Sequence, residues 1–150
     1  MAAELALHLE RVLPAPRALV FQMHTDPDLL ARWWGPKGFS APSIESELRV
    51  GGRYRIEMQP PEGDHFFLTG EFQRVDPPGH LSYSFVYEEP DRDDRETFVE
   101  IALRDLGEST ELILDHRFFA TVARLELHEG GWNESLDRLE GLLASEPPAF

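Results

Sequence analysis

Apolar side chains recur at every second position in a series of short segments, and this alternation constrains the fold more than any other feature. In one segment Leu81, Tyr83 and Phe85 alternate with the polar residues Ser82 and Ser84. A period of two places the apolar side chains on one face of a strand, so each such segment predicts a half-buried strand. We expect strands over residues 4–12, 43–48, 53–58, 66–75, 81–88, 97–103 and 111–117.

The apolar spacing changes between the first two predicted strands. There it predicts two short helices, over residues 17–25 and 27–33. Asp26 is placed to cap the second helix, and Pro27 suits its first helical position. The segment Trp34-Gly35-Pro36-Lys37-Gly38 follows as a loop, because its glycines and proline disfavour a helix.

The last apolar pattern is that of a long helix. Its apolar residues advance by seven, four, three and four positions, at Leu125, Trp132, Leu136, Leu139 and Leu143. This stripe predicts an amphipathic helix with one buried face. Pro147-Pro148 is expected to end it.

The order of these elements predicts an α+β fold. Sequential strands joined by short turns form an antiparallel meander, and a single amphipathic helix must bury its stripe against that sheet. We therefore expect a curved antiparallel sheet that grips a long C-terminal helix, with two short helices after the first strand. The chain of 150 residues is expected to form a single domain over residues 1–150.

Composition and charge exclude several classes of function. The 14 Lys and Arg residues against 28 Asp and Glu residues give a net charge of -14, which repels nucleic acids and anionic membranes. The absence of cysteine excludes disulfides and thiolate metal sites. No apolar run reaches the roughly 20 residues that span a bilayer, and Glu4, His8 and Glu10 interrupt any signal-like stretch. We expect a cytoplasmic protein with no nucleic-acid or membrane partner.

Four motifs, taken in order, resemble a known family. They are the Trp33-Trp34-Gly35-Pro36 loop, the segment Leu48-Arg49-Val50-Gly51-Gly52-Arg53, Gly70-Glu71-Phe72 before Pro77-Pro78, and Gly131-Trp132 followed by Leu136 and Leu139. Together they resemble the Aha-type family, which comprises homologues of the C-terminal domain of the activator of the heat-shock protein 90 ATPase. That family belongs to the START-like (SRPBCC) superfamily. The resemblance covers nearly the whole chain.

The resemblance implies a helix-grip fold with a cavity between the sheet and the C-terminal helix. In many relatives this cavity holds an apolar small molecule, and here we expect it to be lined by Trp34, Phe39, Met58, Phe72, Tyr83, Phe85, Val99, Leu114, His116, Trp132 and Leu136. The alternative is that these side chains fill a dry core. The loop from Trp33 to Phe39 is either a mobile lid or a segment that its tryptophans pin to the sheet.

The polar residues give no catalytic, metal or cofactor site. His116 is the one histidine that the alternation points inward, where it would hydrogen-bond either a ligand or a backbone carbonyl. The alternation places Glu57 and Glu100 on the outer face of the sheet. His128-Glu129 begins like a zinc-protease motif, but Trp132 stands where the second histidine is required.

Three functions stay open at this point. The lack of a catalytic constellation favours a non-enzymatic domain that binds a small hydrophobic molecule. The resemblance also allows a chaperone activator or another partner-binding protein, and an enzyme like the polyketide cyclases and aromatases of the superfamily, with His116 as acid or base and Tyr83 as its helper. The sheet edges and the Trp33-Trp34 loop are candidates for a homodimer contact.

Overall fold

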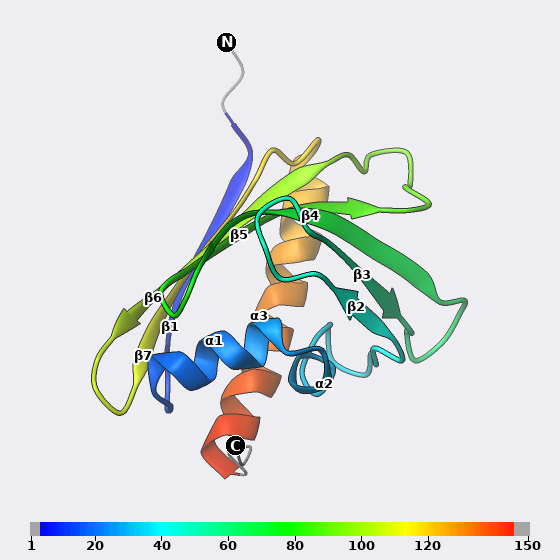
Figure 1. Cartoon of the computed structure of the whole chain (residues 1–150). Coiled ribbons are helices and arrows are strands. Elements are labelled where there is room, and N and C mark those ends of the chain that lie inside the picture. Colours follow the sequence, from blue (N-terminus) through cyan, green and yellow to red (C-terminus); the bar gives the residue numbers. More distant parts are fainter. Residues whose placement is uncertain (1–3, 146–150) are drawn as a thin grey trace.

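A computed structural model describes residues 4–145 and contains one antiparallel sheet and three helices within that range (Figure 1). The strands are β1 (Ala6–Leu13), β2 (Ile44–Ser46), β3 (Arg53–Met58), β4 (Phe66–Asp76), β5 (His80–Tyr87), β6 (Thr97–Asp105) and β7 (Thr110–Arg117). The helices are α1 (Arg17–Thr25), α2 (Pro27–Leu30) and α3 (Val122–Ser145). The predicted α+β class, with its long C-terminal helix, is confirmed.

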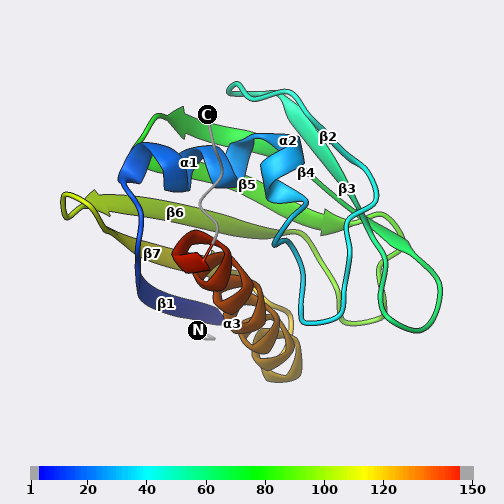
Figure 2. The same cartoon turned by 90° about the horizontal axis from the view of Figure 1, so that it is seen from below.

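The sheet has the strand order β1-β7-β6-β5-β4-β3-β2, and every neighbouring pair is antiparallel. Strands β2 to β7 form a meander, and β1 joins it at the β7 edge, where Leu7 pairs with His116. Figures 1 and 2 show that the sheet is strongly bent and that all three helices lie on its concave side. The bend lets one sheet surround α3.

The alternation in the sequence corresponds to the two faces of this sheet. Along β7 the buried residues are Thr110, Leu112, Leu114 and His116, while the residues between them are more exposed. Strand β5 departs from the alternation at Ser84, which is buried and whose hydroxyl accepts a hydrogen bond from the backbone N–H of Glu71 at 2.9 Å. This bond lies beside a register shift between β4 and β5, a typical place for a sheet to bend.

The second predicted helix is shorter than expected. Helix α2 ends at Leu30, and residues 31–33 form a turn. Trp33 explains this, because its side chain is fully buried and its indole N–H donates to the carbonyl oxygen of Met23 at 2.9 Å. The turn thus places the Trp33 side chain against Met23 of α1.

The other boundaries differ from the predictions by a few residues. The predicted strand 43–48 is limited to Ile44–Ser46, because the chain then turns through Arg49 and Gly52, whose N–H donates to the Arg49 carbonyl. Strand β6 runs two residues further than expected, to Asp105. The expected helix end at Pro147-Pro148 lies outside the described residues.

Gly70 lies where β4 packs closely against Ser84 and Tyr54. A Cβ atom at Gly70 would lie 1.9 Å from the carbonyl oxygen of Ser84 and 2.5 Å from the Tyr54 ring, whose hydroxyl donates to that same carbonyl at 2.6 Å. We expect Gly70→Ala to lower the free energy of unfolding by at least the roughly 1–3 kcal/mol typical of overpacking. Urea denaturation measures this change.

The matched control is Gly141→Ala in α3, where an added Cβ meets no atom within 4 Å. Alanine is the better helix former, so this variant should gain roughly 0.5–1 kcal/mol. Equal effects of the two substitutions would contradict the close approach at Gly70.

Candidate functional site

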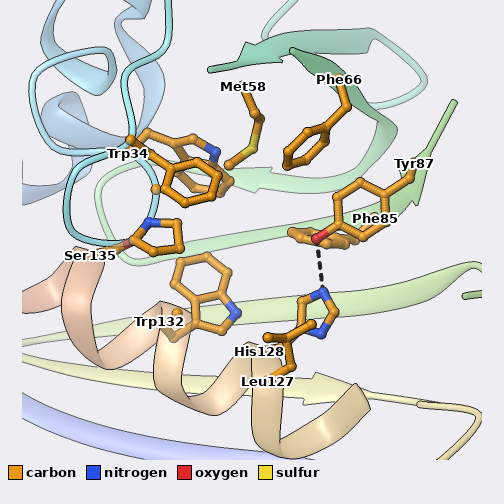
Figure 3. A pocket seen from close by; sticks show the side chains of 13 residues that line it. Trp34, Met58, Phe66, Phe85, Tyr87, Leu127, His128, Trp132 and Ser135 are labelled. Carbon is orange, nitrogen blue, oxygen red and sulfur yellow. Dashed lines mark hydrogen bonds between the residues drawn. The ribbon is translucent and has the colours of Figure 1, made fainter. Parts of the chain in front are cut away.

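A hollow of about 160 Å³ lies between the concave face of the sheet, the loop after α2 and helix α3 (Figure 3). Aromatic and apolar side chains make up most of its wall. The lining residues are Trp34, Gly35, Pro36, Phe39, Met58, Phe66, Phe85, Tyr87, Leu127, His128, Gly131, Trp132 and Ser135. The hollow reaches the surface beside Leu127, whose side chain is largely exposed.

The loop wall of the hollow is fixed by a cation on α3. The guanidinium of Arg138 donates to the carbonyl oxygens of Trp34 at 3.1 Å and Gly35 at 2.9 Å. Gly35 has a φ of 100°, a conformation that favours glycine, and Phe39 packs against the space that its Cβ would take. Trp33 and Trp34 are both buried, so both side chains pack in the core of the protein.

A chain of hydrogen bonds joins α3 to the sheet behind the hollow. The indole N–H of Trp132 donates to Nδ1 of His116 at 3.0 Å. An indole can only donate, so Nδ1 of His116 carries no proton and Nε2 does. The Nε2–H group therefore donates to the hydroxyl of Thr97 at 2.7 Å, which donates in turn to the carbonyl of Phe85 at 3.2 Å. Burial lowers the pKa of His116, which keeps this neutral tautomer.

A second histidine pair borders the hollow itself. Nδ1 of His128 lies 2.7 Å from the carbonyl oxygen of Arg124, which can only accept, so Nδ1 carries the proton. Burial lowers the pKa of His128, and its neutral Nε2 accepts a hydrogen bond from the hydroxyl of Tyr87 at 2.8 Å (Figure 3). Burial also raises the pKa of Tyr87, so this pair is uncharged at neutral pH.

A smaller hollow, about 30 Å³ in volume, lies on the other side of Trp34. Residues from α1 and from the β3, β4 and β5 strands line it, among them His24, Tyr54, Phe72 and Tyr83. Two buried atoms of its lining residues, Nε2 of His24 and Nε1 of Trp34, have no hydrogen-bond partner in the described part of the chain.

The structure divides the eleven residues expected to line a cavity into three groups. Trp34, Phe39, Met58, Phe85 and Trp132 line the larger hollow. Phe72 and Tyr83 line the smaller one. The remaining residues are fully packed in the core and border neither hollow, namely Val99, Leu114, His116 and Leu136.

Four side chains that line the larger hollow are not among the predicted residues, namely Phe66, Tyr87, Leu127 and His128. The prediction that His116 is the one inward histidine is wrong, because His24 is buried and His128 is partly buried. The signal for His128 was present, because it precedes Trp132 by four positions and so shares its helix face.

No acidic residue that the structure describes lines either hollow. Glu100 is exposed on the outer face, and Glu57 is held on the surface by the Ser43 hydroxyl and by Nδ1 of His65. Among residues 4–145 no three His, Asp or Glu side chains are grouped to hold a metal ion. No helix in that range is long and apolar enough to cross a membrane.

A bent antiparallel sheet closed around a long C-terminal helix defines a helix-grip domain of the START-like superfamily. The sequence profile described as Activator of Hsp90 ATPase homolog 1-like protein matches residues 14–144. The chain belongs to that family, as the resemblance indicated.

Solved structures of bacterial proteins show the same fold. A protein from Nitrosomonas europaea is 30% identical with a TM-score of 0.80, and the match covers 97% of this chain and 98% of that one. The AHSA1 protein from Silicibacter pomeroyi is 29% identical with a TM-score of 0.83, covering 95% and 99% of the two chains. A protein from Chromobacterium violaceum is 25% identical with a TM-score of 0.83, covering 94% and 98%. The comparison with curated proteins gives no match.

The hydrogen bond between Trp132 and His116 can be tested by replacing each tryptophan at the hollow. Trp132→Phe keeps an aromatic ring but leaves Nδ1 of His116 as a buried acceptor without a donor, which costs roughly 1–3 kcal/mol. Trp34→Phe is the matched control, because the indole N–H of Trp34 has no partner among the described residues. In urea denaturation we expect Trp132→Phe to be the more destabilising by about that amount. Equal losses would contradict the role of this bond.

His24 should make the folded state sensitive to acid. Burial lowers the pKa of His24 from 6.5 to about 4. Between these values the unfolded chain binds a proton that the folded chain does not, so stability falls as the pH drops, by at most about 1.4 kcal/mol per pH unit. His24→Gln should remove this part of the slope when urea denaturation is followed from pH 7 to pH 4.5.

His8 serves as a control, because its pKa is shifted in the opposite direction to that of His24. It is exposed, and hydrogen bonds to Asp115 and Glu10 raise its pKa. Its contribution is present at low pH and is lost as the pH rises through its folded pKa. His8→Gln should therefore leave the slope below pH 6.5 unchanged and alter it only above that value, so a flattened acid-side slope like that of His24→Gln would refute the assignment.

Proposed function

We propose that this protein is a non-enzymatic binding domain that takes a small apolar molecule into the larger hollow. The observation that carries the proposal is the lining, in which six aromatic side chains surround a space reached from the surface: Trp34, Phe39, Phe66, Phe85, Tyr87 and Trp132. Binding sites for small molecules combine apolar walls with a few polar groups that fix orientation. Here those polar groups are Tyr87, His128 and Ser135.

The volume supports a ligand about the size of one ring. A cavity of about 150 Å³ with apolar walls is sufficient to bind benzene, and this hollow measures about 160 Å³. The hollow is open beside Leu127, so a substituent on the ring can extend toward solvent. Binding would remove apolar surface of the ligand and of the aromatic wall from water, which is the main driving force for such complexes.

Gly131 allows a direct test, because it belongs to the wall. A Cβ atom there would be in ordinary contact with Pro36, at 3.5 Å. The longer side chain of Gly131→Leu should occupy the hollow. With toluene as the probe and tryptophan fluorescence as the readout, we expect its affinity to fall at least tenfold.

The matched control is Gly130→Leu, the same substitution one position earlier in α3. Gly130 is exposed and an added Cβ meets nothing within 4 Å, so toluene affinity should stay within twofold of the wild type. Absence of toluene binding to the wild type, or an equal loss in both variants, would refute the proposed function.

A further inference from the structure

One hydroxyl group in the hollow has its hydrogen atom committed and its lone pairs free. The hydroxyl of Tyr87 donates to Nε2 of His128, and the proton on Nδ1 of His128 is held by the carbonyl of Arg124. Within residues 4–145 no donor is bonded to the Tyr87 oxygen. A phenolic oxygen can still accept a hydrogen bond in this state. Tyr87 therefore presents an acceptor.

The direction of this acceptor is visible in Figure 3, where the hydroxyl of Tyr87 points from β5 toward the middle of the lining side chains. Phe66 packs against the Tyr87 ring with a centroid distance of 5.7 Å, and Phe85 does so at 5.6 Å. These contacts, together with the bond to His128, hold the phenol ring in one orientation. The acceptor is thus preorganised before a ligand enters.

The charge of the lining restricts the ligand further. None of the residues that line the hollow is Asp, Glu, Lys or Arg. An ionised ligand would lose its hydration without gaining a charged partner, which is strongly unfavourable. A neutral ring avoids this cost, and the edge-to-face arrangement of Trp34 and Trp132, with centroids 5.3 Å apart, provides aromatic contacts on the opposite wall.

We infer that the hollow selects a neutral, single-ring aromatic compound that carries one hydrogen-bond donor, such as a phenol or an aniline, and that the Tyr87 oxygen accepts this hydrogen bond. The inference rests on the proposed function and adds the chemical class of the ligand. The ring lies between the aromatic walls, and its O–H or N–H group faces Tyr87. His128 acts as a positioning residue, because it fixes the direction of the Tyr87 hydroxyl.

The test compares phenol with toluene, which has the same number of non-hydrogen atoms but no donor. The fluorescence of Trp34 and Trp132, which line the hollow, reports both affinities. In the wild type we expect phenol to bind at least as tightly as toluene. In the double variant Tyr87→Phe with His128→Leu, which removes both acceptors from this wall, the ratio of phenol affinity to toluene affinity should fall about tenfold, because a buried donor is left unpaired.

Two further variants complete the experiment. Tyr83→Phe removes the hydroxyl group of a tyrosine that lines only the smaller hollow. The ratio of phenol affinity to toluene affinity should therefore stay unchanged in this variant. Tyr87→Phe alone leaves Nε2 of His128 without its donor and able to accept from phenol, so the ratio should fall less in this variant than in the double variant. A ratio unchanged in the double variant, or a wild type that prefers toluene tenfold, overturns the inference while toluene binding still supports the proposed function. Failure of both probes to bind the wild type refutes the proposed function itself.

Discussion

The contact between α3 and the concave face of the sheet determines the rest of this structure. Helix α3 buries Trp132, Leu136, Leu139 and Leu143, and the sheet has to bend in order to surround that stripe. Apolar burial is not directional, so by itself it would allow the helix to slide or rotate. The hydrogen bond from Trp132 to His116 removes this freedom, since it requires one indole on α3 to meet one imidazole on β7.

The hollow exists because this contact is incomplete at one end of the helix. Just before Trp132, α3 has Gly131, which lines the hollow and has no side chain to fill it. Arg138 holds the facing loop at its carbonyl oxygens, which keeps that loop from moving inward to close the gap. A void that the surrounding elements cannot close is the condition for a ligand site in a packed interior.

The sequence was sufficient to predict the strands, the long helix and the inward face, because these follow from local periods of two and 3.6 residues. Phe66 and Tyr87 share that inward face with Leu68 and Phe85, but alternation alone does not mark them as lining residues. An inward side chain borders a void only where the side-chain volumes of several strands and helices together leave space unfilled. A local sequence pattern contains no information on that total volume. Leu136 and Trp132 occupy equivalent positions in the apolar stripe of α3, so the pattern does not tell which of them borders the hollow. Only Trp132 does.

The acidic segment over residues 88–96 shows how a charged surface can position an uncharged site. Within this acidic segment Asp94 is largely buried against Arg124, which also pairs with Asp91 at 3.0 Å. The guanidinium of Arg124 contacts this segment, and the backbone carbonyl of Arg124 contacts His128. The same residue thus anchors the loop that follows Tyr87 and sets the tautomer that directs the Tyr87 hydroxyl. The consequence is geometric: the ion pairs of Arg124 with Asp91 and Asp94 hold the segment that follows β5 against the start of α3, where the neutral hydrogen bond of the hollow forms.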